Sequence, residues 1–187
     1  MSLHCAVFIA TSLDGFIARD DGSIDWLETA NATIPPGEDC GYADFMASVD
    51  VLVMGSGTFE KVLFFPEWPY GEKPVWVVSR TRTDLPAHLP PQVRLMNLTP
   101  AEIASIARHS GYQRLYVDGG QLIQSFLQDA LITELTITTI PVLLGAGRAL
   151  FGRLARDVPL ALVASRAYPF GFVQSTYRVI SGAPDPQ

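Results

Sequence analysis

The sequence predicts a single α/β domain, a three-layer sandwich in which a mostly parallel sheet lies between two layers of helices and ends in an antiparallel hairpin. Its length of 187 residues suits one domain with a substantial core. Short apolar segments rich in Val and Ile alternate with segments of helical periodicity, which is typical of a parallel sheet covered on both faces. Two β-rich segments around Pro169-Phe170-Gly171 predict the closing hairpin.

The individual elements follow from local patterns. Continuous apolar runs predict buried strands at residues 3–10, 51–54, 74–79, 114–118 and 134–140. Apolar side chains at helical spacing predict helices within residues 40–49, from about Phe59, and within residues 121–131. Thr99-Pro100-Ala101-Glu102 is a capping box with proline at the first helical position, so a helix is expected to begin there and to end by Gly111.

The segment from residue 11 to residue 38 is rich in Asp, Gly, Asn and Pro, and it predicts a long irregular loop interrupted by Trp26 and Leu27. Loops of this length in a compact domain are usually either functional or disordered. The last residues, SGAPDPQ, have the composition of a loose chain end. We therefore expect one folded domain over residues 1–180 and a flexible tail over residues 181–187.

Composition argues against several classes of partner. The formal net charge is −6, and no run of Lys or Arg is present that would track a phosphate backbone, so a nucleic acid is not expected. No apolar stretch approaches the roughly 20 residues of a membrane span. Cys5 and Cys40 have neither the number nor the spacing of a disulfide framework or a zinc site. We expect a cytoplasmic protein without a metal, which acts on a small molecule.

Two junctions between a strand and a helix carry glycine. Gly55-Ser56-Gly57-Thr58 follows the strand at 51–54, and Gly119-Gly120 follows the strand at 114–118 and precedes Gln121 and Leu122. Free N–H groups at such junctions bind phosphate, and glycine lets the backbone approach a ligand closely. The first junction lacks the third glycine of a Rossmann fingerprint and the Lys of a P-loop. The junctions either flank one pyrophosphate or are ordinary tight turns.

The order of these signals resembles the dihydrofolate-reductase-like superfamily, and in particular stand-alone relatives of the reductase domain of the bifunctional riboflavin-biosynthesis deaminase-reductase. The matching stretches run in family order from residue 10 to residue 151: ATSLDGFIA, GSIDWL, GYADFMASVDVLVMGSGTFE, VWVVSR, LYVDGGQLIQSFL and ELTITTIPVLLGAGRALF. The resemblance implies a dihydrofolate-reductase-like fold and NADPH as the cofactor.

The resemblance also implies which residues meet that cofactor. The first junction corresponds to the family's Gly-x-x-Thr beside the pyrophosphate, and Ser79-Arg80 to its Ser-Arg beside the 2′-phosphate. Ala10 and Ile17 match positions that line the nicotinamide. The implied cofactor-binding residues are therefore Ala10, Ile17, Gly55, Ser56, Gly57, Thr58, Ser79, Arg80, Arg82, Gly119, Gly120, Gln121 and Leu122.

Two departures from the family pattern affect the cofactor and the substrate. Ser56 and Gly57 stand where relatives usually carry a basic residue, so only Arg80 and Arg82 remain to meet a 2′-phosphate, and weak discrimination between NADPH and NADH is expected. The deaminase motifs and the Asp-Asn-Pro segment of the riboflavin enzyme are missing. The family-favoured substrate is 5-amino-6-(5-phosphoribosylamino)uracil. Dihydrofolate or a pterin, a non-catalytic dinucleotide-binding module and a flavin-binding electron carrier are the alternatives.

Reduction of a C=N bond requires a proton as well as a hydride, and a carboxyl group of raised pKa is suited to supply it. Asp39 lies 16 residues before Gly55, the spacing of the acid in dihydrofolate reductases, and Thr138 resembles the threonine that partners that acid. The alternative for Asp39 is a helix N-cap.

Other side chains are candidates for contact with the substrate. Trp26, Tyr42 and Arg148 are the predicted substrate-binding residues, although Trp26 is equally suited to packing and Arg148 to an ordinary loop or a dimer contact. Because relatives often pair through sheet edges and the late hairpin, a homodimer is expected.

Overall fold

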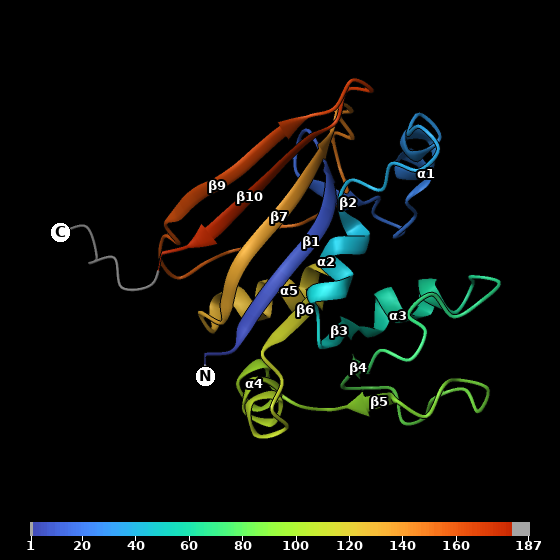
Figure 1. Ribbon diagram of the computed structural model, residues 1–187, viewed down its shortest axis with the longest axis vertical. Helices are drawn as coiled ribbons and strands as arrows, with labels where there is room; N and C mark the ends of the chain where they lie inside the picture. Colours follow the sequence, from blue (N-terminus) through green and yellow to red (C-terminus); the bar gives the residue numbers. More distant parts are fainter. Residues whose placement is uncertain (1, 181–187) are drawn as a thin grey trace.

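Within residues 2–180, which the computed structural model describes, an eight-stranded sheet runs through the centre of the molecule in the order β5-β4-β3-β6-β1-β7-β10-β9 (Figure 1). The first six strands in this order pair in parallel, and β10 and β9 join antiparallel as a hairpin. This confirms the predicted α/β architecture and its closing hairpin. The predicted tail, residues 181–187, lies outside the described residues.

The strands of this sheet are β1 (His4–Ser12), β3 (Val51–Gly55), β4 (Val75–Val78), β5 (Val93–Met96), β6 (Arg114–Asp118), β7 (Ile132–Ile140), β9 (Leu160–Ala167) and β10 (Val173–Val179). A smaller sheet in the described chain pairs β2 (Phe16–Ala18) with β8 (Arg148–Ala149). The helices are α1 (Asp25–Asn31), α2 (Tyr42–Ser48), α3 (Ser56–Val62), α4 (Pro100–His109) and α5 (Gly120–Gln128).

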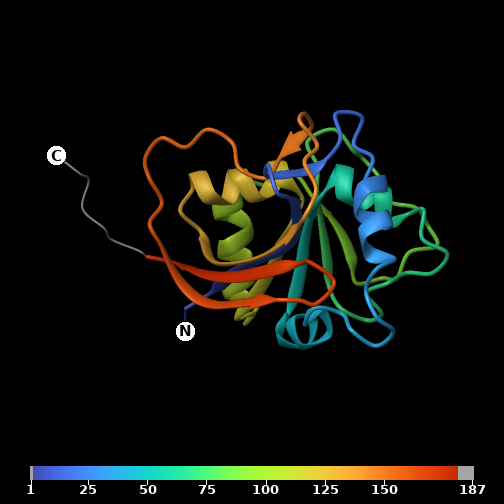
Figure 2. The same ribbon diagram turned by 90° about the horizontal axis from the view of Figure 1, so that it is seen from above.

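Helices cover both faces of the main sheet (Figure 2). Strand β3 shows how the sequence achieves this, because its side chains alternate between faces with a period of two. Val51 and Val53 pack in a core with α4 and α5, whereas Leu52 and Met54 pack in a second core with α2 and α3. A strand that is apolar at every position is therefore the expected centre of a three-layer sandwich.

Helix α4 begins as its sequence predicts. The Thr99 hydroxyl accepts from the Glu102 N–H, the Glu102 carboxylate accepts from the Thr99 N–H, and Pro100 occupies the first turn. The two reciprocal bonds satisfy N–H groups that would otherwise lack partners at the helix start.

The structure contains elements that the sequence patterns do not reveal. Residues 25–31, expected to be mostly loop, form helix α1, whose first turn is not capped by a side chain. Strands β2 and β8 are too short for periodicity to indicate them, and β5 is only half buried. Strand β1 continues to Ser12, two residues beyond its predicted end, because β7 pairs with it along that length.

Candidate active site

The carboxyl ends of β4, β3 and β6 lie side by side at one edge of the sheet. Met54 is in register with Asp118, and Gly55 with Val78. The segments that follow these strands therefore leave the sheet at the same level, which places both glycine junctions and Ser79 at the edge where α/β sheets bind ligands.

The two predicted glycine junctions are in direct contact. A Cβ added to Gly119 would lie 2.7 Å from Thr58 Oγ1 and 3.6 Å from the Gly55 backbone nitrogen. Gly119 has φ of 97°, a conformation that favours glycine. The backbone at Gly119 thus lies close to the Thr58 hydroxyl and the Gly55 amide. A larger residue at Gly119 would prevent this close approach.

Ile17 covers the second junction. A Cβ at Gly120 would lie 2.6 Å from Ile17 Cδ1, and Gly120 opens helix α5 without a side-chain cap on its first turn. The side chains of Thr58 and Ile17 occupy the space that a Cβ at Gly119 or Gly120 would take, and the amides at the start of α5 can attract an anion. Leu122 lies beside the first junction, since its Cβ is 4.0 Å from a Cβ placed at Gly55. These residues fit the pyrophosphate of a dinucleotide.

The turn after β4 carries the predicted cations. The Ser79 hydroxyl accepts from the N–H groups of Thr81 and Arg82, at 3.3 and 3.0 Å, and so shapes the turn. Arg82 pairs with Glu60 at 3.3 Å and lies over the ring of Phe59. Arg80 is exposed and makes no ion pair or hydrogen bond with another described residue. Arg80 is therefore the cation of this turn that remains available to an anion.

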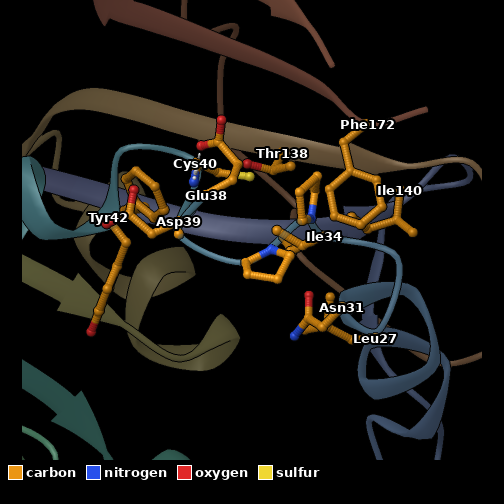
Figure 3. Close-up of a pocket in the computed structure, with 15 residues that line it drawn as sticks. Leu27, Asn31, Ile34, Glu38, Asp39, Cys40, Tyr42, Thr138, Ile140 and Phe172 are labelled. Atoms are coloured by element: carbon orange, nitrogen blue, oxygen red, sulfur yellow. Dashed lines mark hydrogen bonds between the residues drawn. The ribbon is translucent and has the colours of Figure 1, made fainter. Parts of the chain in front are cut away.

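A pocket of about 660 Å³ lies against β1 and β7 (Figure 3). Figure 3 shows Leu27 and Asn31 on one side of it and Thr138 and Phe172 on the other. Its walls bring together four of the predicted site residues: Ala10, Asp39, Tyr42 and Thr138. Ala10 and Thr138 are cross-strand neighbours in the β1–β7 pair.

Asp39 lies in the pocket wall, but its environment differs from the expected one. Its carboxylate accepts the N–H groups of Gly41 and Ala43, each at 2.8 Å, and these bonds lower the pKa of Asp39. The N-cap of α2 is Gly41, so Asp39 serves the first turn of that helix from two residues further back. The expectation of a raised pKa is wrong for this residue.

Asp118 is a site residue that sequence reasoning missed. It ends β6, its carboxylate accepts the Gly119 N–H at 2.8 Å, and burial raises its pKa to about 6. Burial, and to a smaller extent the charge of Asp118, raises the pKa of Tyr42, which lines the pocket, and of Tyr70 and Tyr116. Asp118 thus belongs to the second glycine junction and does not line the pocket. The signal in the sequence is an acidic residue that ends a buried strand immediately before a glycine pair.

Trp26 and Arg148 do not line this pocket. Trp26 is buried in a small core with Cys40, Tyr168 and Phe172, as its packing alternative predicts, and it borders a separate hollow of about 420 Å³. Arg148 donates to the Asp20 carbonyl and packs on Gly22, so it holds the loop after β2. Trp26 therefore packs behind two residues that line the pocket, Cys40 and Phe172.

Two features are absent from the described part of the chain. No helix within residues 2–180 is both long and apolar enough to span a membrane. The same residues contain no group of three or more His, Cys, Asp or Glu side chains arranged to hold a metal ion.

Comparison with known proteins places this architecture in a family. The model of the RibD C-terminal domain matches residues 4–173, and the chain therefore belongs to the RibD C-terminal domain family. The uncharacterized protein YwjB of Bacillus subtilis (strain 168) is 32% identical over 171 residues, which cover 90% of this chain and 94% of YwjB. The resemblance that the sequence motifs indicate is confirmed.

Solved structures agree with this assignment. A crystal structure from Shewanella sp. PV-4, of a protein whose name refers to riboflavin biosynthesis, superposes with a TM-score of 0.89 at 40% identity and covers 95% of this chain and 99% of its own. The Thermotoga maritima deaminase/5-amino-6-(5-phosphoribosylamino)uracil reductase has a TM-score of 0.70 at 16% identity, over 96% of this chain and 57% of its own. At that identity the likeness shows the fold alone. The chain thus shares its fold with these proteins and covers 99% of the Shewanella chain.

Proposed function

We propose that this protein is an NADPH-dependent reductase that delivers hydride to an imine or heterocyclic substrate, with 5-amino-6-(5-phosphoribosylamino)uracil as the favoured substrate. One observation carries the proposal: the glycine junctions after β3 and β6 touch each other beside a pocket lined by Ala10 and Thr138. A dinucleotide gripped at the junctions and a substrate in the pocket would meet at the ends of β1 and β6.

The residues present fit NADPH in three places. Gly55, Thr58 and Gly119 would hold the pyrophosphate, Arg80 would meet the 2′-phosphate, and Ile17 would cover the nicotinamide end. When bound, NADPH supplies the hydride, and the protein supplies alignment and exclusion of water.

The proton has two candidate carriers with opposite properties. Asp39 is a stable carboxylate, because backbone N–H groups lower its pKa, and it is suited to orient a substrate amino group. Burial raises the pKa of Asp118 to about 6, so most Asp118 side chains hold a proton only below about pH 6. We assign proton delivery to Asp118 and substrate orientation to Asp39 and Thr138, a division typical of sites in which two acids have different surroundings.

Binding and turnover test the proposal separately. Fluorescence titration with NADPH is expected to give saturable binding, and mixing with 5-amino-6-(5-phosphoribosylamino)uracil is expected to consume NADPH at 340 nm. Turnover of dihydrofolate alone would favour a pterin reductase, and binding without any turnover would favour a non-catalytic dinucleotide-binding module. Absence of NADPH binding, or a purified protein that carries a yellow flavin, would contradict the proposal.

Cofactor preference tests the role of the turn after β4. Because Arg82 is paired with Glu60, Arg80 carries most of the attraction for a 2′-phosphate. NADPH is therefore expected to be favoured over NADH only modestly, and Arg80→Ala is expected to remove the preference with little effect on NADH. Equal use of both cofactors by the unaltered protein would show that Arg80 does not meet the phosphate.

A further inference from the structure

A cross-strand row of side chains connects the pocket to the outer hairpin. Ala10 on β1 is in register with Thr138 on β7, Thr138 with Gln174 on β10, and Gln174 with Arg166 on β9. Residues in register share one face of a sheet, so these side chains form a continuous line across four strands. Ala10 and Thr138 line the pocket, and Gln174 lies beside Thr138 on the next strand.

Gln174 fixes the direction of the hydrogen bonds in this row. Its Nε2 donates to the Cys40 carbonyl at 3.0 Å and to Thr138 Oγ1 at 2.9 Å. Because a carbonyl oxygen only accepts, the bond to Cys40 determines which end of the amide carries the N–H groups. The Thr138 oxygen is therefore an acceptor toward Gln174, and the hydroxyl hydrogen of Thr138 is left to donate elsewhere.

Nothing among the described residues accepts the Thr138 hydrogen. Thr138 is 6% exposed and lines the pocket, and its single side-chain hydrogen bond within the described chain is the one from Gln174. A buried hydroxyl whose hydrogen has no acceptor in the protein is satisfied by water or by a ligand atom that accepts.

The same amide restrains a strained turn. Cys40 has φ of 55°, which side chains rarely adopt, and Gly41 follows with φ of 80°. Gln174 holds the carbonyl of Cys40, and Glu38 accepts the Cys40 N–H at 2.8 Å while Arg166 pairs with Glu38 at 3.3 Å. Two residues of the hairpin, Gln174 and Arg166, therefore hold this turn. Asp39, which lines the pocket, is part of the turn.

We propose that Gln174 is a positioning residue, which holds the turn at Cys40 and makes Thr138 a fixed hydrogen-bond donor. The pocket then selects a substrate that presents an acceptor, a carbonyl oxygen or an unprotonated ring nitrogen, to Thr138. The identity of the substrate rests on the proposed function, whereas the restraint of the turn does not.

Thiol reactivity tests the restraint without any substrate. Gln174→Met keeps the length of the side chain and removes its N–H groups, so the turn loosens and Cys40, 7% exposed, is expected to react with 5,5′-dithiobis(2-nitrobenzoate) at least about 10-fold faster. Cys5, 1% exposed on β1, is the internal reference, read by peptide mass spectrometry. Gln92→Met is the matched control, since Gln92 donates to the Gly71 carbonyl at 2.9 Å in another part of the molecule. Equal reactivity of Cys40 in the unaltered protein and Gln174→Met would overturn the restraint.

Kinetics test the selection. Gln174→Met and Thr138→Val are each expected to raise KM for the hydride-accepting substrate about 10-fold, while KM for NADPH changes by less than about twofold. The double variant is expected to have a KM no higher than that of Thr138→Val. Gln174→Glu, which cannot donate to Cys40, provides a second variant if Gln174→Met is unstable. If the protein is active and the Gln174 variants keep KM unchanged, the proposed selection of an acceptor-bearing substrate is refuted, and the restraint of the turn is not. A protein without turnover of any offered substrate would refute the proposed function, while the thiol result still decides the restraint.

Discussion

Asp118 shows how surroundings determine the chemistry of a single side chain. Burial raises its pKa from 3.8 to about 6, whereas the more exposed Asp39 has its pKa lowered by two N–H groups. Charge and spacing in the sequence do not distinguish the two residues, because the difference arises from desolvation and from local backbone geometry. The distance from Gly55 in the sequence points to Asp39, and Asp39 lines the pocket.

The raised pKa of Asp118 predicts a particular pH dependence of stability. Between about pH 4 and pH 6 the folded protein binds more protons than the unfolded chain, so the free energy of unfolding falls as the pH rises through this window. Asp118→Asn keeps an oxygen for the Gly119 N–H and removes the buried charge. It is expected to be more stable than the unaltered protein at pH 8, by up to about 3 kcal/mol, and equally stable at pH 3.5.

Urea denaturation at the two pH values measures this difference, and a gain of the same size at both would show that ionisation is not its cause.

The same substitution is expected to lower the activity if Asp118 delivers the proton. At pH 6 the kcat of Asp118→Asn is expected to be about 100-fold or more below that of the unaltered protein, because a general acid usually contributes a factor of this size.

Gly119 carries the contact between the glycine junctions, and replacing it tests that contact. Gly119→Ala would place a methyl group 2.7 Å from Thr58 Oγ1 at a φ of 97°. We expect a loss of about 1–3 kcal/mol in stability and at least a 10-fold loss of NADPH affinity, measured by denaturation and fluorescence titration. Gly111→Ala is the control, because Gly111 has a similar φ of 79° with open space around it. A similar loss of affinity in both variants would mean that the contact is not specific to the cofactor.

At the scale of elements, patterns of apolar spacing are sufficient to predict helices and strands whose burial is regular. The all-apolar β3 and the amphipathic α5 were found because period and burial agree in them. Helix α1 and the pair β2–β8 were missed, since α1 has no side-chain cap and the two strands comprise three and two residues. These elements depend on tertiary contacts, such as the Leu150 N–H bonded to the Gly15 carbonyl, which no local pattern encodes.

The capping box of α4 gives a prediction for an element away from the site. Thr99→Ala removes the hydroxyl that accepts the Glu102 N–H and is expected to lower the free energy of unfolding by about 0.5–2 kcal/mol. Glu102→Gln keeps an oxygen for the Thr99 N–H and is expected to cost less. Thermal or urea unfolding measures both, and NADPH affinity is expected to be unchanged. A larger loss from Glu102→Gln would mean that charge, and not the reciprocal bonds, stabilises this helix start.

At the scale of the whole molecule, the outer hairpin presents an edge suited to pairing. Strand β9 ends the sheet (Figure 1). Its side chains Leu160, Leu162 and Val163 are exposed. Exposed apolar side chains on an edge strand favour association with a second strand. We predict a homodimer, which light scattering after size-exclusion chromatography would show as twice the mass of the chain. Leu162→Lys is expected to give monomers, and a monomeric unaltered protein would contradict the prediction.

The position of β1 in the sheet has a consequence for synthesis. This strand comes first in the chain and pairs only with β6 and β7 in the described structure, for example His4 with Arg114 and Ala10 with Thr138. A ribosome must therefore translate most of the chain before β1 can pair with its neighbours, and the apolar side chains of β1 lack these native partners until then. Slow, late closure of the sheet is built into this strand order, and a nascent chain stalled before β7 would be the most prone to aggregate.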